Sequence, residues 1–439
     1  MDKTGLYNHF FRAASSFTDI FPRAGANVLD RTVLPIAGSD LLAWAKVRDA
    51  RRIVGNIDTF DKILVVSDLN IGDALFAQAL VSGLRDFFPA ANVDLVVNRV
   101  AAAMVEGNSE IDNVLPVFSG RPVPTREDVA GLARTMIRGR YDFTIIISPF
   151  ISPQNLPGAD RNVIDFSSFA TVLLNTFRRQ GAIAHVVYQL YRFIYRLFKG
   201  LIVRVTERDY KGVTVRMPAS SVDWVADFLR RNNLDVNDKI VMIKPDTSSR
   251  FTVIPVSNLV RLVKRISRMD CRILLGSGHL DTEIENEIAG RLTRSEASAV
   301  TMIPPMLPIE VYSSLVDSAG VFISGDSGPL HIAAAWKYTR EDDSEMRNHT
   351  SIVSVFGATP ARIYAYDSNL PGFFPANQDA PSHAFVSESP CRNITCINKL
   401  AKTCRHVRCF ESLDIDSISS AIRSAIEEPR ATLETCLVK

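Results

Sequence analysis

Neither sign of charge dominates this sequence, which has 50 lysine and arginine residues against 48 aspartate and glutamate residues. A protein that binds nucleic acid through a long-range field carries a clear basic excess, so the near-neutral balance argues against nucleic acid as a partner. Long apolar runs are also missing. No stretch reaches the roughly 18 apolar residues that a membrane-spanning helix needs, and the amino terminus lacks the apolar core of a signal peptide. We therefore expect a cytoplasmic protein.

Cysteine is scarce, with six residues, but four of them lie close together: Cys391, Cys396, Cys404 and Cys409. Thiolates at this density can close a tetrahedral zinc or iron site, and a cytoplasmic setting disfavours disulfides. We predict a structural metal here, without a role in catalysis, because four thiolates leave no open position for a substrate. Reduced cysteines that fill a small loop core are the alternative.

Strand-like and helix-like segments alternate through both halves of the chain. Apolar runs predict strands at 62–67, 93–97, 143–147, 240–243, 271–275, 321–323 and 352–355. Such alternation is typical of parallel sheets covered by helices, so we expect an α/β protein.

The chain is longer than one hydrophobic core usually accommodates, so two domains are expected. We place an amino-terminal Rossmann-like domain at 57–235 and a carboxyl-terminal domain at 236–439. Residues 1–56 look like a helical extension, of which 41–52 would lie against the first domain.

The most informative segment is 322–336, which predicts a buried strand, a tight glycine turn and a helix. The first N–H groups of a helix have no intrahelical partner, and the helix dipole adds positive charge there, so such a turn can bind a phosphate. Gly325 and Gly328 would let the backbone approach a ligand, and Asp326 and Ser327 place polar atoms at the mouth. A well-capped helix without a ligand is the alternative, because turns of this type are common.

A second strand-turn-helix unit begins at residue 62. Its apolar strand breaks at Gly72 and Asp73, an amphipathic helix follows, and the strand at 93–97 completes a βαβ unit. Asp73 would lie near the carboxyl end of the first strand, where open α/β sheets bind their ligands. On local grounds Asp73 is equally well explained as the N-cap of the helix.

Together these segments resemble glycosyltransferase family 9, the ADP-heptose heptosyltransferases of bacterial surface polysaccharide synthesis. The resemblance covers roughly residues 60–430, although 150–235 matches poorly. The matching motifs are 71–75, 108–114, 325–333 and 355–360. The third, in which His331 follows Asp326 by five residues, is the most specific. The resemblance implies the GT-B fold, in which two doubly wound Rossmann-like domains face each other across a cleft.

The family implies an inverting, metal-independent enzyme that transfers heptose from ADP-heptose to a lipopolysaccharide core or related glycan. Its catalytic carboxylate corresponds to Asp73, which would accept the proton of the incoming hydroxyl. In protein-modifying heptosyltransferases of this family a comparable cysteine cluster holds a metal.

The donor would be held from the turn after residue 324. Asp326 would bind sugar hydroxyls, and the backbone N–H groups of Ser327, Gly328 and Leu330 would bind the diphosphate. His331 either reaches a phosphate oxygen or packs beneath the first helical turn.

One departure from the family pattern falls in 244–255. Family members place a lysine there to neutralise the donor phosphates, and the corresponding residue in this chain is Thr252. We expect Arg250 to reach the diphosphate instead, with a bidentate geometry that lysine lacks. The hydroxyls of Thr247 and Ser248 would add donors.

The nucleoside half of the donor is expected near Gly276, with Asp281 or Glu283 as candidates for a ribose hydroxyl. The charged run 341–345 is typical of a solvated loop beside the donor helix.

Residues 186–204 interleave aromatic and aliphatic side chains with Arg192, Arg196, Lys199 and Arg204. Such a helix can lie on a membrane surface, so contact with lipid phosphates of the inner membrane is one prediction. A helix buried against its own domain with a basic edge is the favoured alternative.

Two other functions stay open. The cysteine cluster suggests a protein O-heptosyltransferase, so the acceptor is either a lipid-linked glycan or a protein hydroxyl. Thr252 in place of lysine suggests a non-catalytic protein that binds nucleotide sugars as a scaffold.

Overall fold

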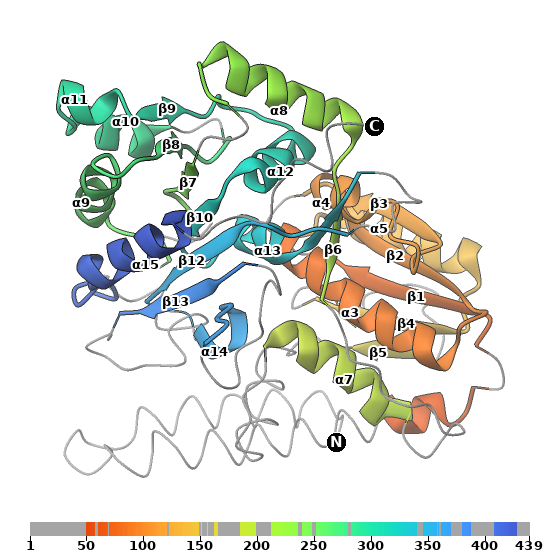
Figure 1. Ribbon diagram of the computed structural model, residues 1–439. Coiled ribbons are helices and arrows are strands. Elements are labelled where there is room, and N and C mark those ends of the chain that lie inside the picture. Colours follow the sequence, from red (N-terminus) through yellow and green to blue (C-terminus); the bar gives the residue numbers. More distant parts are fainter. Residues whose placement is uncertain are drawn as a thin grey trace, which may run out of the picture.

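Two large parallel sheets, each covered by helices, make up the part of the chain that the computed structural model describes (Figure 1). That part comprises residues 50–57, 60–68, 70–120, 123–148, 151, 156, 162–165, 185–198, 212–235, 239–247, 252–279, 282–339, 346–357, 359, 361–369, 380–387 and 408–427.

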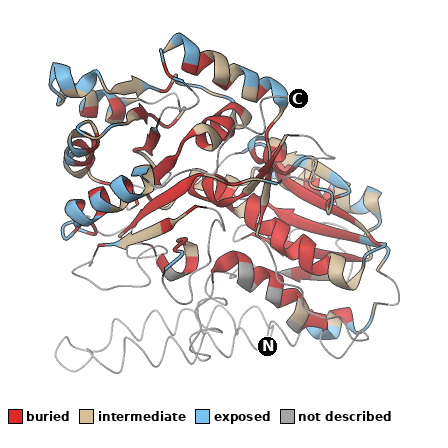
Figure 2. Cartoon of the chain, viewed as in Figure 1, coloured by how far each residue is buried: buried red, intermediate tan, exposed pale blue. Residues whose placement is uncertain are grey.

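The amino-terminal sheet has the strand order β3-β2-β1-β4-β5, and all of its pairings are parallel. Its strands are β1 (Lys62–Ser67), β2 (Asn92–Asn98), β3 (Asn113–Phe118), β4 (Phe143–Ile147) and β5 (Val163–Asp165). The helices with it are α3 (Ile71–Phe87), α4 (Arg99–Val105), α5 (Arg126–Gly139) and α7 (Val186–Phe198). Central strands of a parallel sheet are buried on both faces, which is why β1 reads as a continuous apolar run (Figure 2).

The carboxyl-terminal sheet has the order β13-β12-β10-β7-β8-β9 and is also parallel throughout. Its strands are β7 (Ile240–Lys244), β8 (Arg272–Leu275), β9 (Val300–Met302), β10 (Val321–Ser324), β12 (Ser351–Phe356) and β13 (Ser382–Val386). The helices with it are α8 (Ala219–Arg231), α9 (Val256–Ile266), α10 (Glu283–Gly290), α11 (Arg294–Ala297), α12 (Ile309–Ser318), α13 (Gly328–Ala334), α14 (Ala361–Tyr364) and α15 (Ile415–Glu427). The expected α/β fold with two doubly wound sheets is confirmed.

The two halves are joined by a small parallel sheet in which β6 (Thr214–Arg216) pairs with β11 (Trp336–Tyr338). On the amino-terminal side, the Gln78 side chain of α3 donates to the Thr214 carbonyl oxygen at 2.8 Å and accepts from Asn108 at 2.8 Å. These contacts tie α3 to the strand that crosses between the halves.

The division into domains stays a proposal, and the packing of α8 bears on where it falls. Val225, Phe228 and Leu229 of α8 share one apolar cluster with Ile240 and Leu274 of the carboxyl-terminal sheet. Helix α8 therefore packs with the second half, which favours a boundary ahead of residue 219 instead of at 235.

Helix α7 packs against α3 with its described apolar side chains buried, including Tyr191, Ile194 and Phe198. The Tyr191 and Tyr195 hydroxyls both donate to Oδ2 of Asp86 at 2.6 Å. The buried alternative therefore holds for these side chains. The structure does not describe the basic side chains on which the membrane prediction rests: Arg192, Arg196, Lys199 and Arg204. None of the helices in the described part is long and apolar enough to cross a membrane.

Of the expected extension 1–56, residues 1–49 lie outside the described part. Residues 50–54 are helical, and Ala50 and Val54 are buried in the amino-terminal core. Of the segment 41–52 that is predicted to lie against the first domain, only 50–52 is described, and Ala50 there is buried.

Candidate active site

Both sheets reverse their strand order at one point, between β1 and β4 in the first and between β7 and β10 in the second. The crevice outside the carboxyl ends of the strands at such a switch point is where open α/β sheets bind ligands. Asp68 and Asp73 follow β1, and Asp326 follows β10. Three carboxylates therefore lie at the two switch points.

Asp73 lies in the first turn of α3. The helix begins at Ile71 with Asn70 as its N-cap, and the Asp73 N–H donates to the Asn70 carbonyl oxygen at 3.1 Å. The alternative that Asp73 is itself the N-cap is therefore wrong, because the chain turns into the helix two residues earlier than the glycine break indicates.

The Asp73 carboxyl holds its proton more tightly than an ordinary aspartate. Burial raises its pKa to about 7, and the nearby carboxylates of Asp326 and Asp68 add to the rise. A base is most effective when its pKa is close to the working pH, so this carboxyl is suited to accept a proton near neutrality.

Asp326 lies between β10 and α13, in the strand-turn-helix unit that the sequence predicts. Ser327 is the N-cap of α13 in an extended conformation, and its hydroxyl is 2.8 Å from that of Ser324. The Asp326 side chain is 19% exposed, so a solute can reach it. Burial nevertheless raises its pKa to about 6.

The amino-terminal ends of α3 and α13 meet at the seam between the domains. A Cβ added to Gly72 would lie 2.9 Å from Cδ2 of His331, and one added to Gly328 would lie 3.3 Å from Cβ of Ile71. Gly328 thus permits contact between domains, where a ligand was expected. Because Asp73 follows Gly72 and Asp326 lies two residues before Gly328, the two carboxylates face the same seam.

Gly325, the other glycine of the turn, also lies against atoms of the protein itself. A Cβ on Gly325 would lie 2.5 Å from the carbonyl oxygen of Thr252, so the close approach is made by backbone and not by a ligand. Thr252, at the position of the family lysine, is buried, and its hydroxyl is 2.5 Å from that of Thr247. Thr247 therefore lies beside the turn that carries Asp326, on the side where the donor is expected.

His331 is 3% exposed, and Nδ1 is 2.9 Å from the Tyr366 hydroxyl. Its ring packs edge-on against Phe76 of α3, with centroids 4.5 Å apart. Burial, with the neighbouring His185, holds the pKa of His331 well below its usual value, so the ring is neutral. His331 therefore packs beneath the first turn of α13, which is the second of the two interpretations given for it above.

Leu330, which is predicted to bind the diphosphate through its N–H, uses that group within the helical turn. Its N–H already donates to the Ser327 carbonyl oxygen at 3.0 Å, and its side chain is fully buried. We therefore leave Leu330 out of the proposed donor site and keep Ser327 and Gly328.

Gly276 lies at the carboxyl end of β8 and is held by the fold itself. Its N–H donates to the Ile243 carbonyl oxygen at 3.1 Å, and its own carbonyl oxygen accepts from the Tyr312 hydroxyl at 3.3 Å. The next residue, Ser277, donates to Glu285 from both its N–H and its hydroxyl, at 3.0 and 2.9 Å. Contact with a nucleoside at this position stays a prediction.

Several predicted residues lie outside the described part of the chain: Arg250, Ser248, Asp281, Cys391, Cys396 and Cys404, together with the run 341–345. Cys409 is described, and it is buried in an apolar cluster beside Phe410. Within the described ranges no group of three or more His, Cys, Asp or Glu side chains could hold a metal ion.

Sequence reasoning missed Asp68, Tyr364 and the ion pair of Lys244 with Asp246. Tyr364 is close to both Asp73 and Asp326, since burial and then these two carboxylates raise its pKa. Lys244 is 2% exposed at the end of β7 and donates to the Asp246 carbonyl oxygen at 2.7 Å. The sequence does carry a signal for this buried cation, because Lys244 directly follows the apolar residues of its strand.

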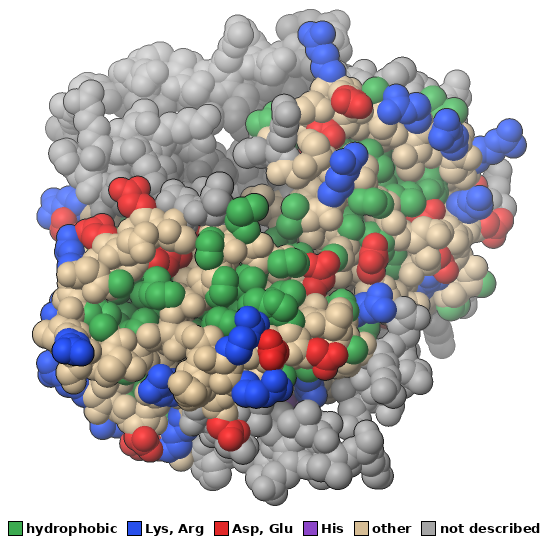
Figure 3. All heavy atoms as spheres, turned by 90° about the horizontal axis from the view of Figure 1, so that it is seen from above, with side chains coloured by type: hydrophobic (Ala, Val, Ile, Leu, Met, Phe, Trp, Pro, Cys, Tyr) green, Lys and Arg blue, Asp and Glu red, His purple; other side chains and the backbone are tan. Residues whose placement is uncertain are grey.

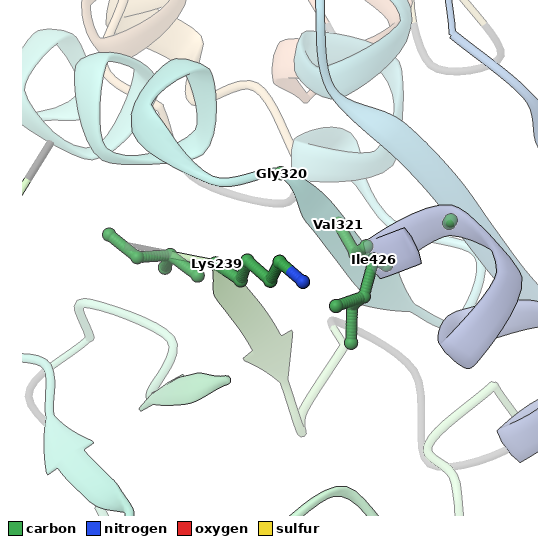
Figure 4. Close-up of a pocket in the computed structure, with 6 residues that line it drawn as sticks. Lys239, Gly320, Val321 and Ile426 are labelled. Atoms are coloured by element: carbon green, nitrogen blue, oxygen red, sulfur yellow. The ribbon is translucent and has the colours of Figure 1, made fainter. Parts of the chain in front are cut away.

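A small hollow elsewhere is not part of this site. It is lined by Lys239, Gly320, Val321 and Ile426, at the amino ends of β7 and β10 (Figure 4). The hollow therefore lies at the opposite edge of the sheet from Asp326. Ligands of open α/β sheets bind at the carboxyl ends of the strands, so the hollow is not a candidate ligand site.

Two Rossmann-like halves that meet at a seam have the architecture of the GT-B fold. Residues 210–341 match the family model described as glycosyltransferase family 9 (heptosyltransferase). This match confirms the resemblance to glycosyltransferase family 9 seen in the motifs of the chain.

Curated relatives agree with this match. Lipopolysaccharide heptosyltransferase 3 of Escherichia coli is 22% identical over 293 residues, which cover 66% of this chain and 81% of the relative. The protein of the same name from strain K12 is 23% identical over 308 residues, 66% of this chain and 80% of the relative.

Among solved structures, a glycosyl transferase family 9 protein from Veillonella parvula has a TM-score of 0.60 at 14% identity, covering 84% of this chain and 98% of that one. The ADP-heptose lipopolysaccharide heptosyltransferase II of E. coli has a TM-score of 0.51 at 14% identity, covering 78% and 99%. At this identity the likeness shows the GT-B fold alone.

Proposed function

We propose that this enzyme is an inverting heptosyltransferase that moves heptose from ADP-heptose to a lipopolysaccharide core or related surface glycan. The observation that carries the proposal is the pair of carboxylates, Asp73 and Asp326, that face one seam from two domains and both hold protons more tightly than usual. The family-model match and the relatives, which are named as lipopolysaccharide heptosyltransferases, support the choice of sugar and acceptor.

In this proposal Asp73 is the base. It accepts the proton of the acceptor hydroxyl as that oxygen bonds to the anomeric carbon, while the bond from that carbon to the diphosphate oxygen breaks and ADP leaves. Attack opposite the leaving group inverts the anomeric centre. A pKa of about 7 lets Asp73 be ionised in much of the protein at neutral pH and still accept a proton.

The carboxyl-terminal side holds the donor. Asp326 accepts hydrogen bonds from sugar hydroxyls, and the N–H groups of Ser327 and Gly328 face the diphosphate. Arg250 supplies the positive charge that Thr252 cannot, and Thr247 and Ser248 add hydroxyl donors.

The adenosine half is assigned to the carboxyl edge of β8. It would lie near Gly276, and Asp281 would accept a hydrogen bond from a ribose hydroxyl. The support is the position of β8 next to β7, the strand at the switch point of this sheet.

A structural zinc or iron at Cys391, Cys396, Cys404 and Cys409 belongs to the proposal as well. Cys409, the described member, is 2% exposed, so a metal bound to it would be enclosed by the fold and away from substrate. Elemental analysis of the purified protein, with Cys404→Ser as the comparison, tests this site. Cytoplasmic location with contact to the inner membrane is likewise proposed, on the basis that the acceptor is lipid-linked.

The test of function is acceptor-dependent release of ADP from ADP-heptose. Wild-type protein should release ADP with lipopolysaccharide core as acceptor, and Asp73→Asn should lose about 100- to 10,000-fold in kcat. Asp94→Asn is a matched control, since Asp94 is a buried aspartate of β2 bonded to Tyr141 and Asn113. Turnover by Asp73→Asn at the wild-type rate would contradict the proposal.

A further inference from the structure

A third carboxylate, Asp68, lies at the switch point of the amino-terminal sheet and has no part in the function above. It is the residue after β1 and is 4% exposed. The neighbouring strand β4 ends at Ile147, and the hydroxyl of the next residue, Ser148, donates to Oδ2 of Asp68 at 2.8 Å. Ser148 in turn accepts from the Ile151 N–H at 3.0 Å. The carboxylate is thus fixed between the two strands that form the crevice.

The other oxygen of this carboxylate is unusual. Oδ1 of Asp68 is buried and has no hydrogen-bond partner within the described part of the chain. A buried carboxylate oxygen without a hydrogen-bond partner destabilises the folded protein, because it has lost its contacts with water and gained none in return. Such an arrangement is expected where function requires the charge, because a neutral side chain of the same shape would cost the fold less.

Asp68 and Asp73 lie at the same end of β1. Helix α3 starts three residues after Asp68, and Asp73 lies in its first turn. Among the described residues, the ionisable groups near Asp73 are Asp68 after β1, Asp326 from the turn before α13 and Tyr364 from α14. His331 of α13 lies 4.0 Å from Asp326 and is held neutral. A like charge disfavours ionisation of its neighbour, so Asp68 and Asp326 both favour the protonated form of Asp73.

We propose that Asp68 is a positioning residue that sets the proton affinity of Asp73 from its fixed place at the switch point. This inference rests on the proposed function, in which Asp73 is the base. Asp68 touches neither substrate; it keeps the base strong enough to take a proton from a sugar hydroxyl near neutral pH. Burial raises the pKa of Asp68 itself to about 6, so at pH 7 to 8 it carries the charge that this role needs.

The test is the pH profile of kcat/KM for ADP release by wild type, Asp68→Asn and Asp94→Asn. Loss of the Asp68 charge should move the acid limb to lower pH by about 0.5 to 1 unit, while Asp94→Asn keeps the wild-type limb. Ser148→Ala removes the hydrogen bond that favours ionised Asp68 and should give a smaller move in the same direction. It decides the question if Asp68→Asn does not fold. A limb that stays at the wild-type pH, with the rate lowered equally at every pH, would mean that Asp68 only supports the fold.

A second readout needs no turnover. Carboxyl ¹³C NMR of aspartate-labelled protein follows the titration of Asp73 directly, with Asp73→Asn used to assign the signal. The midpoint should fall by the same amount in Asp68→Asn. If wild-type protein releases no ADP, the proposed function fails, and the NMR midpoint still shows whether Asp68 sets the titration of Asp73. An unchanged midpoint overturns the inference in either case.

Discussion

Asp73 works as a base only when its carboxyl is ionised, and its pKa is raised to about 7 by burial, Asp326 and Asp68. We therefore expect kcat/KM to rise with pH through an acid limb centred near 7. Initial rates of ADP release in buffers of constant ionic strength measure it. A rate that stays flat from roughly pH 5.5 to 8.5 would show that no group with this pKa limits catalysis.

The same carboxylates make stability depend on pH. The pKa values of Asp73 and Asp326 are raised from 3.8 to about 7 and about 6, so the folded state binds protons more tightly than the unfolded state. Their contribution to stability is full below about pH 4 and is lost as pH rises through 6 to 7.

At pH 8 wild-type protein must bury the ionised Asp326 carboxylate, and Asp326→Asn removes this cost. The variant should be more stable than wild type at pH 8 by on the order of 1 to 2 kcal/mol. The difference should shrink toward pH 4. Urea unfolding at both pH values measures it, and Asp94→Asn should show no such gain. Equal stability of Asp326→Asn and wild type at pH 8 would contradict the assignment of a destabilising charge.

Single-residue patterns revealed only part of the site. Asp73 and Asp326 could be predicted because each lies in a short local motif at a strand end. Asp68 could not, because its partner Ser148 is 80 residues away and the pairing exists only once β1 and β4 are side by side. His331 could be predicted to lie at the turn, but its partner Tyr366 could not, for the same reason.

At the scale of elements, the seven predicted strands are all present, and β1 and β4 coincide with the predicted 62–67 and 143–147. All of them lie within the sheets and are covered on both faces, so their sequences are continuously apolar. The edge strands β3, β5, β9 and β13 were not predicted. Edge positions are less buried, and these strands are short or carry polar residues or proline. Their sequences therefore lack the continuous apolar run by which the central strands are predicted.

The crossing of α3 and α13 depends on small residues. A methyl group at Gly72 would lie 2.9 Å from the buried His331 ring, so Gly72→Ala should destabilise the protein by about 1–3 kcal/mol. It should also lower kcat, because the crossing places Asp73 opposite Asp326. Gly290→Ala in α10 is the control, since no atom lies within 4 Å of the added Cβ. Thermal unfolding and ADP release measure the two effects, and a Gly72→Ala protein as stable and active as Gly290→Ala would refute the tight crossing.

At the scale of the whole molecule, acidic and basic side chains are interspersed over the described residues of the face in Figure 3. A single-sign field does not cover that face, and in our proposal the donor is held by local groups at the seam. Arg250 is the proposed local cation.

ADP should therefore raise the melting temperature of wild-type protein, because a ligand that binds only the folded state stabilises it by mass action. Arg250→Ala should lose most of this gain, whereas Arg230→Ala, an exposed arginine paired with Asp227 on α8, should keep it. Thermal shift over a series of ADP concentrations measures the difference. An Arg250→Ala protein stabilised as strongly as wild type would remove Arg250 from the donor site.

The central claim is that two carboxylates face one seam and act on the same reaction. Asp73 from the first domain is the base for the acceptor hydroxyl, and Asp326 from the second domain holds the donor sugar. The most direct test is to measure, in one series, the Kd for ADP-heptose and the single-turnover rate for wild type, Asp73→Asn and Asp326→Asn. We predict that Asp73→Asn binds the donor as tightly as wild type and loses turnover, while Asp326→Asn loses donor affinity. Wild-type binding and wild-type turnover in both variants would contradict the account.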